Sequence, residues 1–201
     1  MYARKTLSRV SAGTQTTDVL LSALAERSAE LGAHVHDVRH LCDLVADELN
    51  LWPEEKAPLL QAASLHDVGK VAIPDAILDK PGPLTDDEWD LMRTHTIVGE
   101  RILGAAPALT EAAKIVRATH ERYDGWGYPD GLAGKQIPLG ARIIAVCDAF
   151  DAMVSPRPYR TQVSAEEAIQ ELTRCSGAQF DPRVVVAFIA ARTRAETAAS
   201  A

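Results

Sequence analysis

The chain has 201 residues, 47% hydrophobic and 24% charged, which is enough to fold into one domain with its own core. Its formal net charge of −7 argues against broad binding to nucleic-acid polymers, which needs a positively charged surface. The three cysteines form no CxxC pair, and no apolar run approaches the ~20 residues that span a bilayer. We therefore expect a cytoplasmic protein without a disulfide framework, a zinc ribbon or a membrane-inserted segment.

The two ends of the chain differ in composition from its middle. Residues 1–16 are basic and then small and polar, which is typical of a linker or of the remnant of a preceding domain. Residues 17–191 contain one helical pattern after another, and we expect them to form a single domain. The alanine-rich residues 192–201 are expected to form a frayed tail.

Apolar residues at helical spacing recur along the middle of the chain, and no segment predicts a strand. Capping-box patterns begin at Thr85 and at Ser164. The apolar stripe that follows Thr85 extends to Ile102, which predicts one helix there, whereas the prolines in residues 74–83 predict a loop. The predicted fold class is all-α, a bundle of about seven helices.

A histidine and an aspartate stand at the end of one predicted helix. His66 offers a neutral nitrogen ligand and Asp67 an anionic oxygen ligand, while Lys70 lies three residues beyond Asp67 on the same side. Imidazole and carboxylate hold metals that activate water, and an ammonium suits a phosphoryl oxygen. The pattern favours metal-assisted phosphoester hydrolysis, although a pair that only hydrogen-bonds a helix end is the structural alternative.

Further candidate ligands lie in apolar stripes or at the ends of other predicted helices, namely His34, His95, His120 and Asp148. Each alone has the alternative of a satisfied core residue, but core histidines should not recur on four helices beside a buried aspartate. Their mixture of nitrogen and oxygen, without a thiolate, suits two cations such as iron or manganese. Glu30 precedes His34 by four residues, which is ligand-pair spacing if the helix continues through Gly32.

Two loops add groups that suit a nucleotide. Residues 123–131 hold too many glycines for a helix and place three aromatic side chains among them, although a loop of this kind can be a mere connector. Arg157 and Arg160 follow the helix that carries Asp148 and Asp151, and the alternative for both arginines is simple solvation. Their place beyond a metal-bearing helix favours phosphate binding.

Together these motifs resemble the HD-GYP family of cyclic di-GMP phosphodiesterases, from about Thr17 to Ile189. The motifs that carry the resemblance are, in chain order, His66-Asp67 with Lys70, Ile73-Pro74-Asp75, Lys80-Pro81-Gly82-Pro83-Leu84, His95, His120-Glu121-Arg122-Tyr123-Asp124-Gly125-Trp126-Gly127-Tyr128-Pro129, and Asp148 with Arg157-Pro158-Tyr159-Arg160. The resemblance implies an HD-domain-like helical core in residues 17–191. It also implies hydrolysis of cyclic di-GMP to linear pGpG, and in many members onward to GMP, in second-messenger signalling.

The resemblance implies a role for each matching residue. Two divalent cations, with a third in some members, would be held by Glu30, His34, His66, Asp67, His95, His120 and Asp148, Glu30 serving the third. Asp67 and Lys70 would be catalytic, with Lys70 facing the scissile phosphate. The substrate would contact Lys70, Tyr128, Pro129, Asp151, Arg157 and Arg160.

One departure from the family pattern leaves alternatives open. Many members carry two adjacent histidines before the glutamate, and here the first is Thr119, a poor ligand, so one cation would be held weakly or by water. The alternatives are a catalytically weak cyclic di-GMP sensor that presents a surface to a partner, and an HD phosphohydrolase for another nucleotide. Residues 1–5 are similar to the last helix of GGDEF-type diguanylate cyclase domains, which implies a GGDEF or regulatory domain before this region. A homodimer is a further expectation.

Overall fold

The computed structural model describes residues 12–22, 29–155 and 162–199, with side chains in the last two ranges described for residues 36–155 and 162–198. Within these ranges the chain is helical, and the only pairing of extended backbone is an isolated bridge between Ser176 and Phe180. The α-helices are α2 (Ala29–Glu48), α3 (Pro53–Leu65), α4 (Asp75–Leu78), α5 (Asp86–Arg93), α6 (His95–Gly104), α7 (Thr110–Arg117), α8 (Leu139–Val154), α9 (Ala165–Arg174) and α10 (Pro182–Ala199). Short 3-10 helices span Val68–Ala72 (η1), Pro107–Leu109 (η2) and Gly134–Gln136 (η3). The predicted all-α fold class is confirmed.

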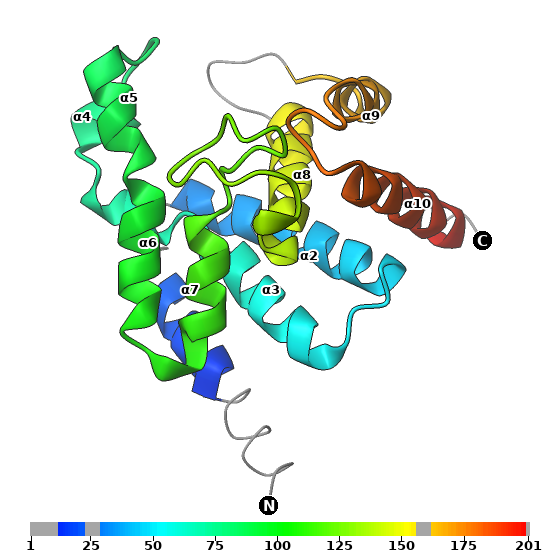
Figure 1. Cartoon of the computed structure of the whole chain (residues 1–201), viewed down its shortest axis with the longest axis horizontal. Helices are drawn as coiled ribbons and strands as arrows, with labels where there is room; N and C mark the ends of the chain where they lie inside the picture. The colour runs from blue at the N-terminus through cyan, green and yellow to red at the C-terminus, as the bar shows by residue number, and fades with distance from the viewer. Residues whose placement is uncertain (1–11, 23–28, 156–161, 200–201) are drawn as a thin grey trace, which may run out of the picture.

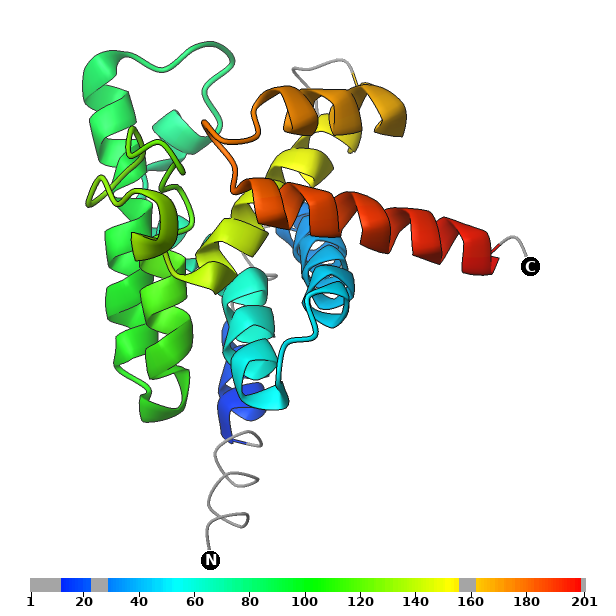
Figure 2. The ribbon, with the colours of Figure 1, turned by 45° about the vertical axis from the view of Figure 1, so that its right-hand side comes forward.

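The helices form two groups that meet along α3 and α8 (Figure 1). On one side α6 and α7 run as an antiparallel pair, with η1 packed on α6. On the other side α2 packs against α3, α8 and α10, and the turned view in Figure 2 shows α10 crossing over this group toward the C-terminus. The junction of the two groups is where the end of α3, the start of α6 and the middle of α8 come together.

One hydrophobic core joins the two groups. Its largest fully buried members include Phe150 and Phe188, whose ring centroids lie 4.9 Å apart, and Leu65 at the end of α3. Burying a large apolar side chain stabilises the fold by roughly 1.5–3 kcal/mol, so these contacts fix α3, α8 and α10 relative to one another. None of the helices in the described ranges is both long enough and apolar enough to cross a membrane.

Both predicted capping boxes are present. The Thr85 hydroxyl accepts a hydrogen bond from the Glu88 backbone N–H at 3.3 Å, and the Glu88 carboxylate accepts from the Thr85 N–H at 2.7 Å. Ser164 and Glu167 make the same reciprocal pair at 3.1 and 2.9 Å. Each box satisfies two backbone donors that a helix start otherwise leaves without partners.

The single helix predicted from Thr85 to Ile102 is instead two helices, α5 and α6, which meet at Thr94. The Thr94 hydroxyl donates to the Leu91 carbonyl at 2.6 Å, and that bond competes with the regular helical ladder. The break separates His95 from the α5 stripe and makes it the first residue of α6. A threonine within an apolar stripe is a weak signal of a helix break, because a continuous helix also tolerates hydrogen bonds from threonine hydroxyls to backbone carbonyls.

Three further segments differ from the sequence-based expectation. Residues 12–16, predicted as linker, belong to a helical stretch over 12–22, and α4 lies inside the predicted loop. The predicted frayed tail is helical to Ala199. Arg192 pairs with Glu196 at 2.6 Å and Arg194 with Glu48 on α2 at 2.9 Å, so the end of α10 is tied to the bundle.

Candidate metal centre

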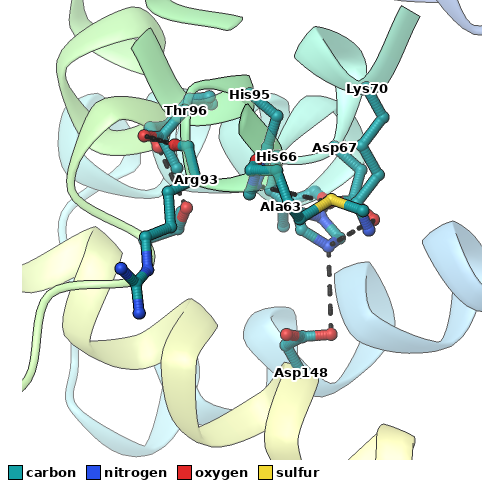
Figure 3. Close-up of polar contacts among 11 residues, drawn as sticks. Ala63, His66, Asp67, Lys70, Arg93, His95, Thr96 and Asp148 are labelled. Atoms are coloured by element: carbon teal, nitrogen blue, oxygen red, sulfur yellow. Dashed lines mark hydrogen bonds and ion pairs between the residues drawn. The ribbon is translucent and has the colours of Figure 1, made fainter. Parts of the chain in front are cut away.

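His66 closes α3 with its ring held by the backbone. Its Nδ1 lies 2.9 Å from the Ala63 carbonyl oxygen, and because a carbonyl only accepts, Nδ1 carries the proton. The lone pair is then on Nε2, which lies 3.7 Å from Asp67 Oδ2 and 3.9 Å from Asp148 Oδ1 (Figure 3). A buried imidazole fixed in this tautomer is the form in which histidine binds metals.

His95 repeats this arrangement at the start of α6. Its Nδ1 donates to the Met92 carbonyl at 2.7 Å, and its buried Nε2, 3.8 Å from Asp67 Oδ1, has no hydrogen-bond partner. A buried acceptor without a partner is unfavourable unless something outside the protein satisfies it. Burial also lowers the pKa of His95, which favours the neutral form that can donate its lone pair to a cation.

His120 completes a compact group of ligand atoms with Asp67 and His95. One ligand atom from each of the three residues lies within 4.8 Å of the other two. Burial, reinforced by the nearby His95, lowers the pKa of His120 to about 4, so this ring is neutral as well. Two neutral imidazoles, one with an unsatisfied Nε2, and a carboxylate at this spacing fit a divalent cation.

Asp67 is the centre of the charge pattern. Burial alone would raise its pKa, but the Lys70 ammonium, which also donates a hydrogen bond to the carboxylate, outweighs burial and holds the pKa well below its ordinary range. Lys70 Nζ lies 2.6 Å from Asp67 Oδ2, with the side chains 33% and 11% exposed. The carboxylate is therefore ionised, and a partly exposed ammonium lies directly beside the ligand group (Figure 3).

A glycine brings η1 and α6 into backbone contact. A Cβ added to Gly69 would lie 1.8 Å from the His95 carbonyl oxygen and 2.6 Å from the Gly99 nitrogen. No side chain fits in that space, so only glycine allows η1 to lie against the first turn of α6. This contact sets the distance between Asp67, just before η1, and His95.

The two aspartates of α8 have different surroundings. Asp148 faces the centre through its 3.9 Å approach to His66 and is about a quarter exposed. Asp151, one turn further along, is buried and accepts from the Ser155 hydroxyl at 2.9 Å. The contacts therefore bring Asp148 to the cluster, whereas the hydrogen bond from Ser155 joins Asp151 to the end of α8.

The glycine-rich loop after α7 presents Tyr128 to the centre. The Tyr128 ring stacks on His120, with centroids 5.2 Å apart and planes 19° apart, and the Tyr128 backbone N–H donates to the His120 carbonyl at 3.2 Å. Burial raises the pKa of Tyr128 to about 12, so its hydroxyl stays protonated. The next residue, Pro129, is half-buried beside it. The His120 ring thus already covers one face of Tyr128, one of the aromatic residues expected to stack on the nucleotide.

A buried glutamate and a half-buried arginine hold this loop. Glu121 accepts from the Asp130 backbone N–H at 2.7 Å and from the Leu132 N–H at 3.1 Å. Arg117 on α7 pairs with the Asp130 carboxylate at 2.7 Å and with Glu100 on α6 at 2.6 Å. The loop is thereby fixed to both helices of the α6–α7 pair, which keeps Tyr128 against His120.

Glu121→Gln is expected to lower the free energy of unfolding by about 1–3 kcal/mol. The amide oxygen can still accept from one of the two backbone N–H groups, but the amide nitrogen leaves the other buried N–H without an acceptor. Chemical denaturation measures the loss. Glu111→Gln is the matched control, since Glu111 is exposed on α7 and makes only a surface pair with Lys114. Equal unfolding free energies for the two variants would contradict a supporting role for Glu121.

Thr119 stands where many HD-GYP members have a histidine. Its side chain is buried, and its hydroxyl donates to the Val116 carbonyl at 2.9 Å. The hydroxyl proton is thus used within the last turn of α7. Thr119 therefore supplies no imidazole to the centre.

Several predicted site residues lie outside the side chains that the structure describes, namely Glu30, His34, Arg157 and Arg160. The backbone of α2 is continuous from Ala29 to Glu48, so Gly32 does not interrupt the helix that carries Glu30 and His34. Their four-residue spacing therefore falls on one helix.

The structure also points to residues that the sequence analysis did not select. Gly69 and Glu121 hold the ligand-bearing elements together, and Arg93 lies next to Tyr128. The glycine two residues after the His-Asp pair and the glutamate directly after His120 were visible in the sequence. Their contacts are made through space, and no sequence signal marks Arg93.

Comparison with known proteins identifies the family. The family model of the HD domain matches residues 18–184. The chain is 43% identical to the cyclic di-GMP phosphodiesterase response regulator RpfG of Xanthomonas campestris over 96% of this chain and 49% of that protein. It is also 43% identical to a cyclic di-GMP phosphodiesterase of Thermotoga maritima, over 85% of this chain and 47% of the relative. The chain thus spans about half the length of the curated relatives it matches.

Solved structures agree with this assignment. A cyclic GMP-AMP-specific phosphodiesterase of Vibrio cholerae, V-cGAP3, superposes with a TM-score of 0.56 at 29% identity, over 88% of this chain and 40% of that one. Bd1817, an HDG"Y"P protein of Bdellovibrio bacteriovorus, gives a TM-score of 0.64 at 20% identity, over 90% and 60%, and shows the same fold. The predicted resemblance is confirmed, and the chain belongs to the HD-domain family.

Proposed function

We propose that this chain is the phosphodiesterase domain of a cytoplasmic signalling protein and hydrolyses cyclic di-GMP to linear pGpG, with GMP as a possible final product. The observation that carries the proposal is the buried His95 Nε2 without a partner, within reach of Asp67 and His120. Several relatives about 40–43% identical to the chain are named cyclic di-GMP phosphodiesterases, which supports this substrate.

In this proposal His66, Asp67, His95, His120 and Asp148 hold two divalent cations together with His34, and Glu30 serves a third. Iron or manganese suits these nitrogen and oxygen donors. Cations bound here supply Lewis-acid stabilisation of the phosphate and an activated water.

The chain's own groups perform the remaining steps. The backbone carbonyls of Ala63 and Met92 orient the His66 and His95 rings, so the ligand geometry exists before substrate arrives. Lys70 donates to an oxygen of the scissile phosphate from its position beside Asp67. Burial of the two imidazoles excludes bulk water, which strengthens these electrostatic contacts.

We further propose that the nucleotide lies over the loop that presents Tyr128 and Pro129, and that Asp151, Arg157 and Arg160 also line its pocket. The protonated Tyr128 hydroxyl is a hydrogen-bond donor at the edge of the metal centre. We also propose a regulatory domain, such as GGDEF, elsewhere in the full protein, which the relatives' greater length supports, and a homodimer.

Metal content tests the foundation of the proposal. Protein purified with iron and manganese available is expected to hold at least two cations per chain by elemental analysis, and His95→Ala is expected to lose most of them. His36→Ala is the control, because His36 is an exposed histidine of α2. Less than one equivalent in the parent, or equal content in both variants, would contradict the site.

A second candidate function, a catalytically weak cyclic di-GMP sensor, is favoured by Thr119. Thr119→His is expected to increase resistance to chelators and to raise turnover if the missing imidazole limits cation retention. Dialysis against a chelator followed by elemental analysis and an activity assay measures both. If neither changes, other groups complete the second cation site.

A further inference from the structure

A guanidinium that no motif marks lies at the edge of the metal centre. Arg93 is the last residue of α5, and its Cζ lies 5.8 Å from the Tyr128 ring centroid and 6.0 Å from that of Trp89. Tyr128 in turn stacks on His120. A continuous row of side chains therefore leads from the exposed surface of α5 to a candidate metal ligand.

The two positively charged side chains next to the metal centre, Lys70 and Arg93, lie on different sides of it. Figure 3 shows Lys70 on one side of the histidine and aspartate cluster and Arg93 on the other. Lys70 is paired with Asp67 at 2.6 Å. A substrate with one phosphate at the metal ligands and Lys70 would extend toward Arg93 when it crosses Tyr128.

Arg93 is held loosely by the protein itself. Its ion pair, Nη1 to Asp90 Oδ1 at 3.2 Å, joins side chains that are 50% and 75% exposed, and such pairs contribute little to stability. The neighbouring rings limit where the planar guanidinium can turn, and half of the side chain is exposed to solvent. A guanidinium with a weak partner and a restricted position can exchange that partner for an anion at low cost.

We propose that Arg93 contacts the substrate and binds, through its N–H edge, the phosphodiester that is not being cleaved. The inference rests on the proposed function, because a cyclic dinucleotide has two phosphodiesters and the metal centre takes only one. The forked donors of a guanidinium match two oxygens of one phosphate. Arg93 on α5 is thus a third arginine proposed to contact the substrate, in addition to the pair predicted at Arg157 and Arg160.

The experiment compares Arg93→Ala and Arg93→Lys with Arg101→Ala, an exposed arginine on α6. The substrates are cyclic di-GMP and bis(p-nitrophenyl) phosphate, which has one phosphodiester and no nucleobase. In Arg93→Ala, KM for cyclic di-GMP is expected to rise about tenfold, the scale of a lost charged hydrogen bond. Hydrolysis of bis(p-nitrophenyl) phosphate should stay at the parent rate. Arg93→Lys should recover part of the loss and Arg101→Ala should match the parent.

A competitor tests which part of the substrate is bound. Cyclic di-AMP has the same two phosphodiesters as cyclic di-GMP, so its inhibition constant should rise by the same factor in Arg93→Ala. A loss confined to cyclic di-GMP would assign Arg93 to guanine and overturn the phosphate contact.

Failures of the two proposals are distinguishable. If the parent hydrolyses cyclic di-GMP and Arg93→Ala keeps its KM, the Arg93 contact is overturned and the proposed function stands. Equal losses with both substrates would show that Arg93 acts by packing on Tyr128, which also overturns a substrate contact. A metal-loaded parent that hydrolyses bis(p-nitrophenyl) phosphate but not cyclic di-GMP would overturn both proposals.

Discussion

Asp67→Asn is expected to abolish hydrolysis of cyclic di-GMP while leaving the helical fold in place. Asp67 lies between His66, His95 and Lys70, where it would be an anionic ligand of the proposed cations, and the amide that replaces it is neutral. Loss of a group that merely supports a metal ligand costs about 10–100-fold in metal affinity or activity, and loss of the anionic ligand itself should exceed that. We therefore expect turnover to fall by more than about a hundredfold.

Turnover with saturating Mn²⁺ and the far-ultraviolet circular-dichroism spectrum measure the two halves of this prediction. Asp79→Asn is the matched control, because Asp79 is exposed at the end of α4 and remote from the ligand group in the contacts described. A folded Asp67→Asn protein with the turnover of the control would show that the His-Asp pair is structural.

Gly69→Ala is expected to have the largest effect on stability. The added methyl group would lie 1.8 Å from the His95 carbonyl oxygen and 2.6 Å from the Gly99 nitrogen, and both of these atoms belong to backbone, so no flexible side chain can move aside. Overpacking a tight contact usually costs about 1–3 kcal/mol and occasionally more, and we expect at least ~3 kcal/mol here. The shift needed to relieve the clash would separate Asp67 from His95, so metal content should fall as well.

Chemical denaturation and elemental analysis of the same preparations test this. Gly82→Ala is the control, because nothing lies within 4 Å of a Cβ placed at Gly82. If Gly69→Ala were as stable and as metal-rich as Gly82→Ala, close contact between η1 and α6 would not set the geometry of the centre.

Most of the fold could be predicted because its determinants are local. The capping boxes at Thr85 and Ser164 depend on residues three apart, and both formed as predicted. His66, Asp67, His95 and His120 could be selected because they interrupt apolar helix stripes or stand at helix ends. We inferred from the number and type of these residues that they converge on one site. In the structure, one ligand atom from each of Asp67, His95 and His120 lies within 4.8 Å of the other two.

The remaining features depend on side-chain hydrogen bonds that compete with the helix or on contacts between distant segments. The break at Thr94 arises from one hydrogen bond of its side chain to the Leu91 carbonyl, and the periodicity of apolar residues contains no information about that bond. The pair between Arg194 on α10 and Glu48 on α2 joins two residues from opposite ends of the domain, which local periodicity does not reveal. The position of Arg93 beside Tyr128 likewise needs α5 and the glycine-rich loop to be placed in space.

Product analysis tests directly whether the metal-loaded chain hydrolyses cyclic di-GMP. The purified chain, loaded with Mn²⁺ or Fe²⁺, is incubated with cyclic di-GMP, and the nucleotides are separated by chromatography beside an identical sample of Asp67→Asn. The parent is expected to form linear pGpG with time, and the variant is expected to form none. Cyclic di-GMP that stays intact with a parent holding two equivalents of metal, or pGpG formed equally by Asp67→Asn, would contradict it.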